Sequence, residues 1–240
     1  MLSKRNFLTA LSVVLITQLA APLMPRALAQ DAGSIDRLSG SATITGADKK
    51  TRPAIAAEKI QSGDTIATDG KGEAMVKLSD STTVLLRPNS EFRFNEYKYE
   101  NKTTDTVLST LLRGTARLVT GLIGRDRPDR FGLTVKTATI GIRGTDFEVA
   151  LMEDGNEAQA RAGIYNVVNQ GATHVALETG EQTDVKKDQT AFAPEHPAPG
   201  EPRLQLLDKR PVFLKAGGHD TMMQQIISQP FRAIQQMPRR

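Results

Sequence analysis

The sequence contains no cysteine among its 240 residues. The chain therefore forms no disulfide bond, has no thiol nucleophile and offers no thiolate ligand to a metal ion. A chain of this length without disulfides depends on its hydrophobic core for stability. The content of 39% hydrophobic residues is sufficient for such a core.

Recognisable catalytic and metal-binding motifs are also missing. The three histidines, His174, His196 and His219, show neither the H-x-x-x-H nor the H-E-x-x-H spacing of a metal site. The sequence has no G-x-S-x-G nucleophile elbow and no phosphate-binding loop. We therefore expect a protein that is not an enzyme, with no catalytic residue, metal site or cofactor. An unrecognised hydrolase is the least favoured alternative.

Long apolar runs are absent as well. The most extended apolar stretch, Phe7 to Leu19, is shorter than the roughly 20 residues that span a bilayer. The basic pair Lys4-Arg5 precedes it, and the triplet Ala27-Leu28-Ala29 follows it before Gln30. This order is typical of a secretory signal peptide, which we predict at residues 1–29. Cleavage would leave a periplasmic or secreted protein without a transmembrane segment. An uncleaved anchor helix is the alternative.

The excess of basic residues belongs largely to the predicted signal peptide. Lys4, Arg5 and Arg26 are three of the 31 basic residues, and no acidic residue precedes Asp31. Because 27 acidic residues remain, cleavage leaves a nearly neutral chain. The charge therefore gives no support to a nucleic-acid partner.

Short alternating patterns dominate the chain from Ile35 to Phe192. Apolar side chains alternate with others in Ala74–Leu78 and Phe147–Leu151, which predicts strands with one buried face. Turn residues separate such segments at intervals of about 8–12 residues. The pattern predicts an all-β domain at residues 30–193, as a single antiparallel-rich sandwich, roll or short solenoid-like domain of short strands. Thr106–Leu112 fits either a strand or a short helix.

The composition changes at Pro194. Five prolines between Pro194 and Pro211 indicate a Pro-rich linker and tail at residues 194–240. Apolar residues at near-helical spacing in Asp220–Arg240 allow one short helix, which Pro230 would end or kink.

Five motifs, in order between about Ile35 and Lys187, resemble those of the FecR domain, the periplasmic domain named for the ferric-citrate sensor protein. They are Gly63–Thr68, Ala74–Thr82, Leu86–Phe92, Gly114–Arg117 and Thr137–Phe147.

Three departures from the family pattern limit what the resemblance implies. The family often has Asp-Gly-Ser where this chain has Asp80-Ser81-Thr82, and proline at the position of Ala138. The transmembrane sensor also carries a sigma-factor-binding segment and a membrane helix before this domain, whereas here a signal peptide precedes it. The resemblance therefore implies the domain and does not extend to sigma-factor regulation.

Arg143 lies in the most distinctive motif. Gly141 and Gly144 flank it, and glycine lets a backbone or ligand approach closely. A guanidinium there is suited to bind a carboxylate or phosphate. The alternative is a structural arginine that binds turn carbonyls or pairs with Asp146. The candidate motif comprises Gly141, Arg143, Gly144, Thr145 and Asp146.

A local arginine run suggests a second kind of site. Its members are Arg113, Arg117, Arg125, Arg127 and Arg130, with Asp126 and Asp129 between them. Such a run is suited to contact an anionic cell-wall or surface glycan. It is also typical of a solvated loop with local ion pairs.

These observations favour a non-enzymatic binding or assembly module at the bacterial cell envelope. The leading hypothesis is a protein-interaction module whose exposed strands pair with a strand of an envelope protein. The alternative is a binder of anionic glycan.

Overall fold

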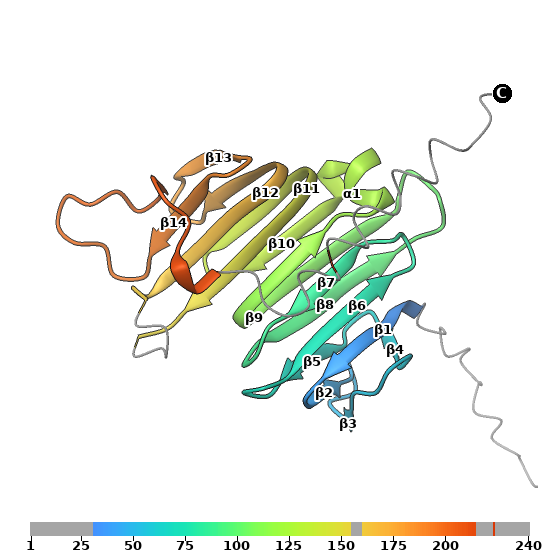
Figure 1. Cartoon of the computed structure of the whole chain (residues 1–240). Helices are drawn as coiled ribbons and strands as arrows, with labels where there is room; N and C mark the ends of the chain where they lie inside the picture. The colour runs from blue at the N-terminus through green and yellow to red at the C-terminus, as the bar shows by residue number, and fades with distance from the viewer. Residues whose placement is uncertain (1–30, 155–159, 215–222, 224–240) are drawn as a thin grey trace, which may run out of the picture.

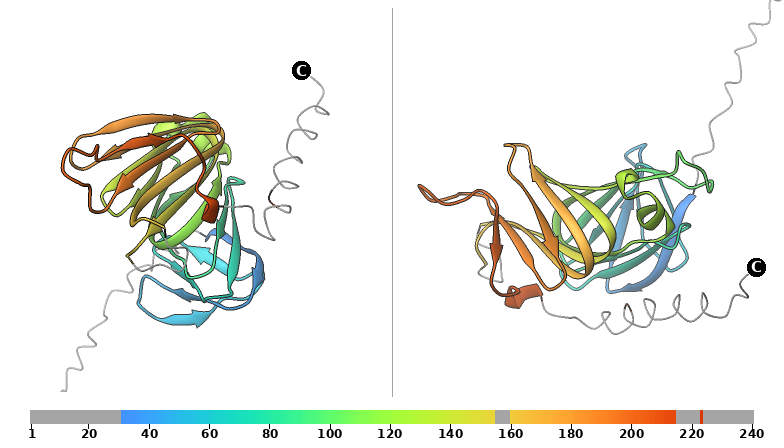
Figure 2. Two further views of the ribbon diagram at one scale, coloured as in Figure 1. Left: turned by 60° about the vertical axis from the view of Figure 1, so that its left-hand side comes forward. Right: turned by 90° about the horizontal axis from the view of Figure 1, so that it is seen from above.

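The computed structural model describes residues 31–154, 160–214 and 223. These residues form 15 strands, the helix α1 (Leu122–Asp126) and two 3-10 turns, Pro128–Arg130 and Val212–Leu214. All strands belong to one hydrogen-bonded sheet that curls into a two-layered roll (Figures 1 and 2). Every strand pairing that the structure describes is antiparallel, except the parallel pair formed by β9 (Thr106–Val119) and β10 (Phe131–Val135). The predicted all-β, largely antiparallel fold is confirmed.

One layer runs in the order β3, β2, β5, β8, β9, β10, β11, β12, β13. The strands confined to it are β2 (Ala42–Thr45), β3 (Thr51–Pro53), β5 (Thr65–Thr68), β8 (Glu91–Lys98), β10 (Phe131–Val135) and β13 (Gln182–Lys186).

The other layer runs in the order β4, β1, β6, β7, β9, β11, β12, β14, β15. The strands confined to it are β1 (Asp31–Ser39), β4 (Lys59–Gln61), β6 (Glu73–Leu78), β7 (Thr83–Leu86), β14 (Thr190–Pro194) and β15 (Gln205–Leu207).

Three long strands join the layers: β9 (Thr106–Val119), β11 (Ala138–Met152) and β12 (Gly163–Leu177). The first half of β9 pairs with β8, and the second half pairs with β7. In the same way β12 pairs with β14 through its first half and with β13 through its second half. Each long strand therefore passes from one layer into the other.

Glycines in left-handed conformation lie where these strands change layer. Gly114 in β9 has φ +80° and Gly144 in β11 has φ +56°. Other residue types adopt such angles only at a cost. At Gly114 a side chain would also meet Ser90 Oγ at 2.5 Å. The glycine in the G-x-x-R motif thus permits a close approach of the strand to the β7–β8 turn.

The space between the layers is filled by one large hydrophobic cluster. Phe92 and Phe94 of β8 are fully buried there and lie edge to face with 5.1 Å between ring centroids. Phe147 of β11 contributes from the other layer. The alternating segments of the sequence thus point their apolar residues into this core.

The turn between β6 and β7 anchors helix α1. Asp80 is fully buried, and its carboxylate accepts hydrogen bonds from the Thr82 amide (3.1 Å), the Thr82 hydroxyl (2.8 Å) and the Ile123 amide (3.3 Å). Ser81 has φ +71°, a conformation that glycine adopts most readily. This explains why glycine suits that position in the family resemblance.

The helical alternative for Thr106–Leu112 is wrong. These residues form the first half of β9, hydrogen-bonded to β8 on one side and to β10 on the other. After Pro194 the chain returns to the sheet, because β15 pairs with β14. The possible helix at 220–240 lies outside the described residues, apart from Met223, which packs against Met75 and Leu85. No described helix is long and apolar enough to span a membrane.

Candidate functional site

The motif Gly141–Asp146 forms the bend of β11. Arg143 is exposed there, opposite Ala172 of β12, and no hydrogen bond involves its side chain among the described residues. A methyl group added to Gly144 would meet no atom within 4 Å, so the surface at the bend is open.

Asp146 forms an ion pair with Arg117 of β9 and not with Arg143. Arg117 Nε donates to Asp146 Oδ1 at 2.9 Å, and Arg117 Nη2 donates to Asp146 Oδ2 at 2.6 Å. Both side chains are over 90% buried. The alternative in which Arg143 pairs with Asp146 is therefore wrong, because Arg117 binds both carboxylate oxygens and Arg143 is exposed.

A pocket of about 270 Å³ lies beside this bend. Arg125 of α1 lines it together with Gly144, Thr145, Asp146 and Gln170, with Val119 and Thr120 completing the wall. Arg125 is exposed and has no ion-pair partner within the described part of the chain. The structure thus brings one arginine of the predicted basic run to the predicted motif.

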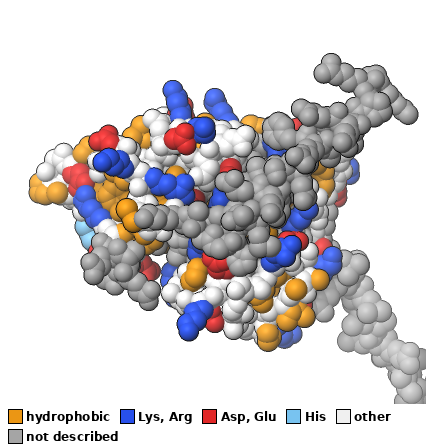
Figure 3. All heavy atoms as spheres, viewed as in Figure 1, with side chains coloured by type: hydrophobic (Ala, Val, Ile, Leu, Met, Phe, Trp, Pro, Cys, Tyr) orange, Lys and Arg blue, Asp and Glu red, His pale blue; other side chains and the backbone are white. Residues whose placement is uncertain are grey.

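The five arginines of that run do not share one surface. Arg117 is buried, whereas Arg113 is exposed on β9 opposite Glu91 of β8. Arg125, Arg127 and Arg130 follow on α1 and the next turn. The face seen in Figure 3 mixes basic and acidic side chains in its described part. Because Arg117 is buried, the run does not form one continuous exposed cationic surface within the described residues.

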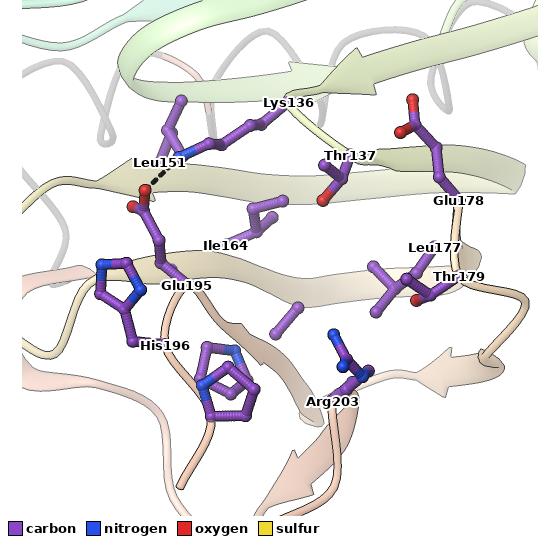
Figure 4. Close-up of a pocket in the computed structure, with 14 residues that line it drawn as sticks. Lys136, Thr137, Leu151, Ile164, Leu177, Glu178, Thr179, Glu195, His196 and Arg203 are labelled. Atoms are coloured by element: carbon purple, nitrogen blue, oxygen red, sulfur yellow. Dashed lines mark hydrogen bonds and ion pairs between the residues drawn. The ribbon is translucent and has the colours of Figure 1, made fainter.

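A second cavity, of about 300 Å³, is lined by both ends of the β11–β12 pair, with Thr137 and Leu177 from one end and Leu151 and Ile164 from the other (Figure 4). We call it the end groove. Its floor includes the buried apolar residues Leu151, Ile164 and Ala193. Its rim carries charged and polar side chains of both signs, namely Lys136, Glu178, Thr179, Glu195, His196 and Arg203.

The rim charges are largely compensated by neighbours. Lys136 Nζ contacts Glu195 Oε1, and this hydrogen bond lowers the pKa of the Glu195 carboxyl below its usual range. Arg203 Nε lies 3.8 Å from Glu181 Oε1. The groove therefore combines an apolar floor with a rim that has no dominant charge.

Sequence reasoning did not identify the end groove. Lys136 and Glu195 are 59 positions apart. Lys136 lies near the Ala138–Leu177 end of the β11–β12 pair and Glu195 near its Gly163 end, and the two residues meet because the bent strands bring these ends together. The only local signals of this groove in the sequence are the apolar side chains of Leu151 and Ile164, and these are equally typical of core residues.

In the described ranges, no group of three or more His, Asp or Glu side chains is arranged to hold a metal ion. His174 Nδ1 lies 2.7 Å from Asp184 Oδ1 on the exposed surface, and this contact lowers the pKa of the Asp184 carboxyl. The pair has no third ligand, and it lies in neither pocket.

Comparison with known proteins gives a family match. The model of the family described as FecR protein matches residues 64–181. A candidate anti-sigma factor from Parabacteroides distasonis, solved by crystallography, is 17% identical over 61% of this chain and 60% of its own, with a TM-score of 0.46. A solved cell surface anchoring domain is 27% identical over 26% of this chain and 82% of its own, with a TM-score of 0.25. The chain thus spans about 60% of the length of the first of these structures. No curated protein matches.

Proposed function

Residues 64–181 of this chain are a FecR domain, and on this premise we propose that the protein is a non-catalytic interaction module that binds an envelope protein through the end groove. The end groove carries the proposal, because it combines an apolar floor with a rim of mixed charge. Protein-binding sites typically combine an apolar centre with a polar rim. A polyanion would instead require an excess of positive charge.

The strands beside the groove support binding of an extended peptide. β13 pairs only with β12, and β15 pairs only with β14, among the strands that the structure describes. Each leaves one row of backbone amide and carbonyl groups for an added strand. Such pairing supplies affinity through the backbone, while a neighbouring pocket selects the side chain.

The proposed location of this interaction is the periplasm or the cell surface. The order of basic residues, apolar run and Ala27-Leu28-Ala29 supports export with cleavage before Gln30. A partner would then be a protein exposed on the outer side of the inner membrane.

The test fills the groove without changing the fold. Thr179 is an exposed rim residue, and Thr179→Trp places a large ring in the groove. Thr139→Trp is the matched control, because Thr139 is exposed on β11 but does not line the groove. Envelope proteins retained by the immobilised chain from Gln30 are identified by mass spectrometry. We expect Thr179→Trp to lose a partner that both wild type and Thr139→Trp retain. Retention by all three proteins would contradict the proposal.

A second candidate function is binding of an anionic glycan. The supporting observation is Arg125, whose exposed side chain lines the pocket beside the β11 bend and has no ion-pair partner among the described residues. Arg143 is exposed on the same bend. Co-sedimentation with intact cell-wall sacculi tests this function: the wild type should pellet in a salt-sensitive manner and Arg125→Glu should not. Failure of the wild type to pellet eliminates the glycan alternative.

A further inference from the structure

A buried carboxylate on the outer face of the sheet is bound by an arginine from the C-terminal segment. Glu148 of β11 has a side chain that is only 2% exposed. Arg210, three residues after β15, reaches it from the surface, and its Nη2 donates to Glu148 Oε2 at 2.7 Å. A charge-assisted hydrogen bond of this length is among the stronger polar contacts in proteins.

The other two nitrogens of this guanidinium also donate hydrogen bonds. Arg210 Nη1 donates to Asn169 Oδ1 at 2.7 Å, and Arg210 Nε donates to the carbonyl oxygen of Leu214 at 2.8 Å. Glu148 and Asn169 thus present two acceptor oxygens in the geometry that a planar guanidinium requires. We call these two residues the arginine socket.

The sheet itself holds the socket in place. Arg87 Nη2 donates to Glu148 Oε1 at 3.3 Å. This contact holds the carboxylate so that its other oxygen, Oε2, faces Arg210. Asn169 Nδ2 donates to Asp146 Oδ1 at 3.1 Å, which turns the amide oxygen toward Arg210. Asp146 is fixed in turn by Arg117. The socket is therefore preorganised by residues that do not belong to the C-terminal segment.

Apolar contacts accompany the arginine. Phe213 lies edge to face with Tyr165, with 5.1 Å between the ring centroids. Leu214 is 1% exposed and packs in a cluster with Ala150 and Val167. The segment is thus bound by an arginine and by two apolar side chains that follow three and four residues later.

The remaining residues of the segment make few contacts. Asp208, Lys209 and Val212 are exposed, and the Arg210 side chain is 39% exposed although the carboxylate that it binds is buried. The anchor points therefore belong to a short segment that approaches the sheet from outside, as a bound peptide does.

We propose that Glu148 and Asn169 form a recognition site for an arginine-bearing peptide, and that Arg210–Leu214 occupies this site in cis. A partner segment with arginine followed by large apolar residues at the third and fourth positions replaces it. This site lies on the outer face of the sheet and shares no residue with the end groove. Its test is therefore independent of the test of the proposed function.

The test opens the site in the full chain. The Arg210→Ala, Leu214→Ala variant removes both anchors, and a fluorescent peptide with the sequence of residues 205–214 serves as the probe. We expect saturable binding to this variant and at least tenfold weaker binding to the wild type, whose own segment competes. The peptide carrying Arg210→Gln should bind the variant at least tenfold more weakly. Arg93→Ala, which removes an exposed arginine of β8 outside the socket and the end groove, should behave as wild type.

A second variant covers the case in which the double variant does not fold. Leu214→Ala alone leaves the arginine in place and should bind the probe more strongly than the wild type. Adding Glu148→Gln to either folded variant should abolish binding, because the socket loses its charge. Absence of binding by a folded opened variant, or equal binding of the Arg210→Gln peptide, overturns the proposal.

Discussion

Arg117 on β9 and Asp146 on β11 form a bidentate ion pair across the point where both strands pass between the layers. Their sequence separation is 29 residues, and each lies in a different one of the five motifs that resemble the FecR domain. The pair therefore links the central G-x-x-R segment to the Gly141–Asp146 bend.

Removal of Arg117 is expected to destabilise the fold strongly. Arg117→Ala leaves the buried carboxylate of Asp146 without its partner, and breaking a buried pair typically costs about 3–5 kcal/mol. Arg143→Ala is the matched control from the neighbouring motif. Because Arg143 is exposed, its replacement should change the free energy of unfolding by no more than about 0.5 kcal/mol. Urea unfolding of the two variants checks the difference, and an equal loss in both would refute it.

The two bend glycines should differ in their tolerance of alanine. Gly144→Ala is expected to cost about 1–2 kcal/mol, from its backbone conformation alone, since no atom lies within 4 Å of the added methyl group. Gly114→Ala adds a clash with Ser90, whose Oγ accepts a hydrogen bond from the Thr115 amide at 2.9 Å. Thermal unfolding should therefore show a larger loss for Gly114→Ala. A larger loss for Gly144→Ala would contradict this account of the bends.

Glu201 should contribute to the pH dependence of stability. Hydrogen bonds from the Arg161 guanidinium and, to a lesser extent, from the Ala198 amide lower the pKa of this carboxyl from 4.5 to about 2. A carboxyl whose pKa is lowered on folding stabilises the protein above its unfolded pKa, and this stabilisation is lost as the pH falls toward the folded pKa. Glu201→Gln should therefore flatten the decline in stability between about pH 5 and pH 2.

The same comparison in an Arg161→Gln background supplies the control. Once the guanidinium is gone, the additional change Glu201→Gln should alter the acid decline much less. An equal effect in both backgrounds would show that another group causes the pH dependence.

The predicted signal peptide is tested by the mass of the exported chain. Cleavage after Ala29 yields a protein that begins at Gln30, directly before the first described strand at Asp31. Intact-mass analysis of the periplasmic fraction should show this species. Recovery of a chain that retains residues 1–29 in the membrane fraction would support the anchor-helix alternative.

The strands with strict alternation could be predicted from the sequence, because every second residue in them is apolar and lies on the buried face. Phe147 and Val149 are such residues, and both are fully buried. Thr106–Leu112 could not be assigned in this way. Val107 and Leu111 are buried while Leu108 and Leu112 are 40% and 44% exposed, and only pairing with β8 and β10 decides that this pattern is a strand.

The candidate sites could not be predicted, because they depend on contacts between residues that are far apart in the sequence. The five arginines lie close together in sequence, but β9 buries Arg117 and leaves Arg113 exposed. The arginine socket joins Glu148 to Arg210, which are 62 positions apart. Such pairs follow from strand order and from the return of the chain after β15, and neither is apparent in residue spacing.

The most direct test of the end groove as a protein-binding site is site-specific photocrosslinking in living cells. A photoreactive phenylalanine at Thr179 reports on the groove rim, and the same residue at Thr139 reports on an exposed surface outside the groove. We predict one discrete protein adduct from position 179 and none from position 139. No protein adduct from position 179, or the same adducts from both positions, would contradict a partner bound in the groove.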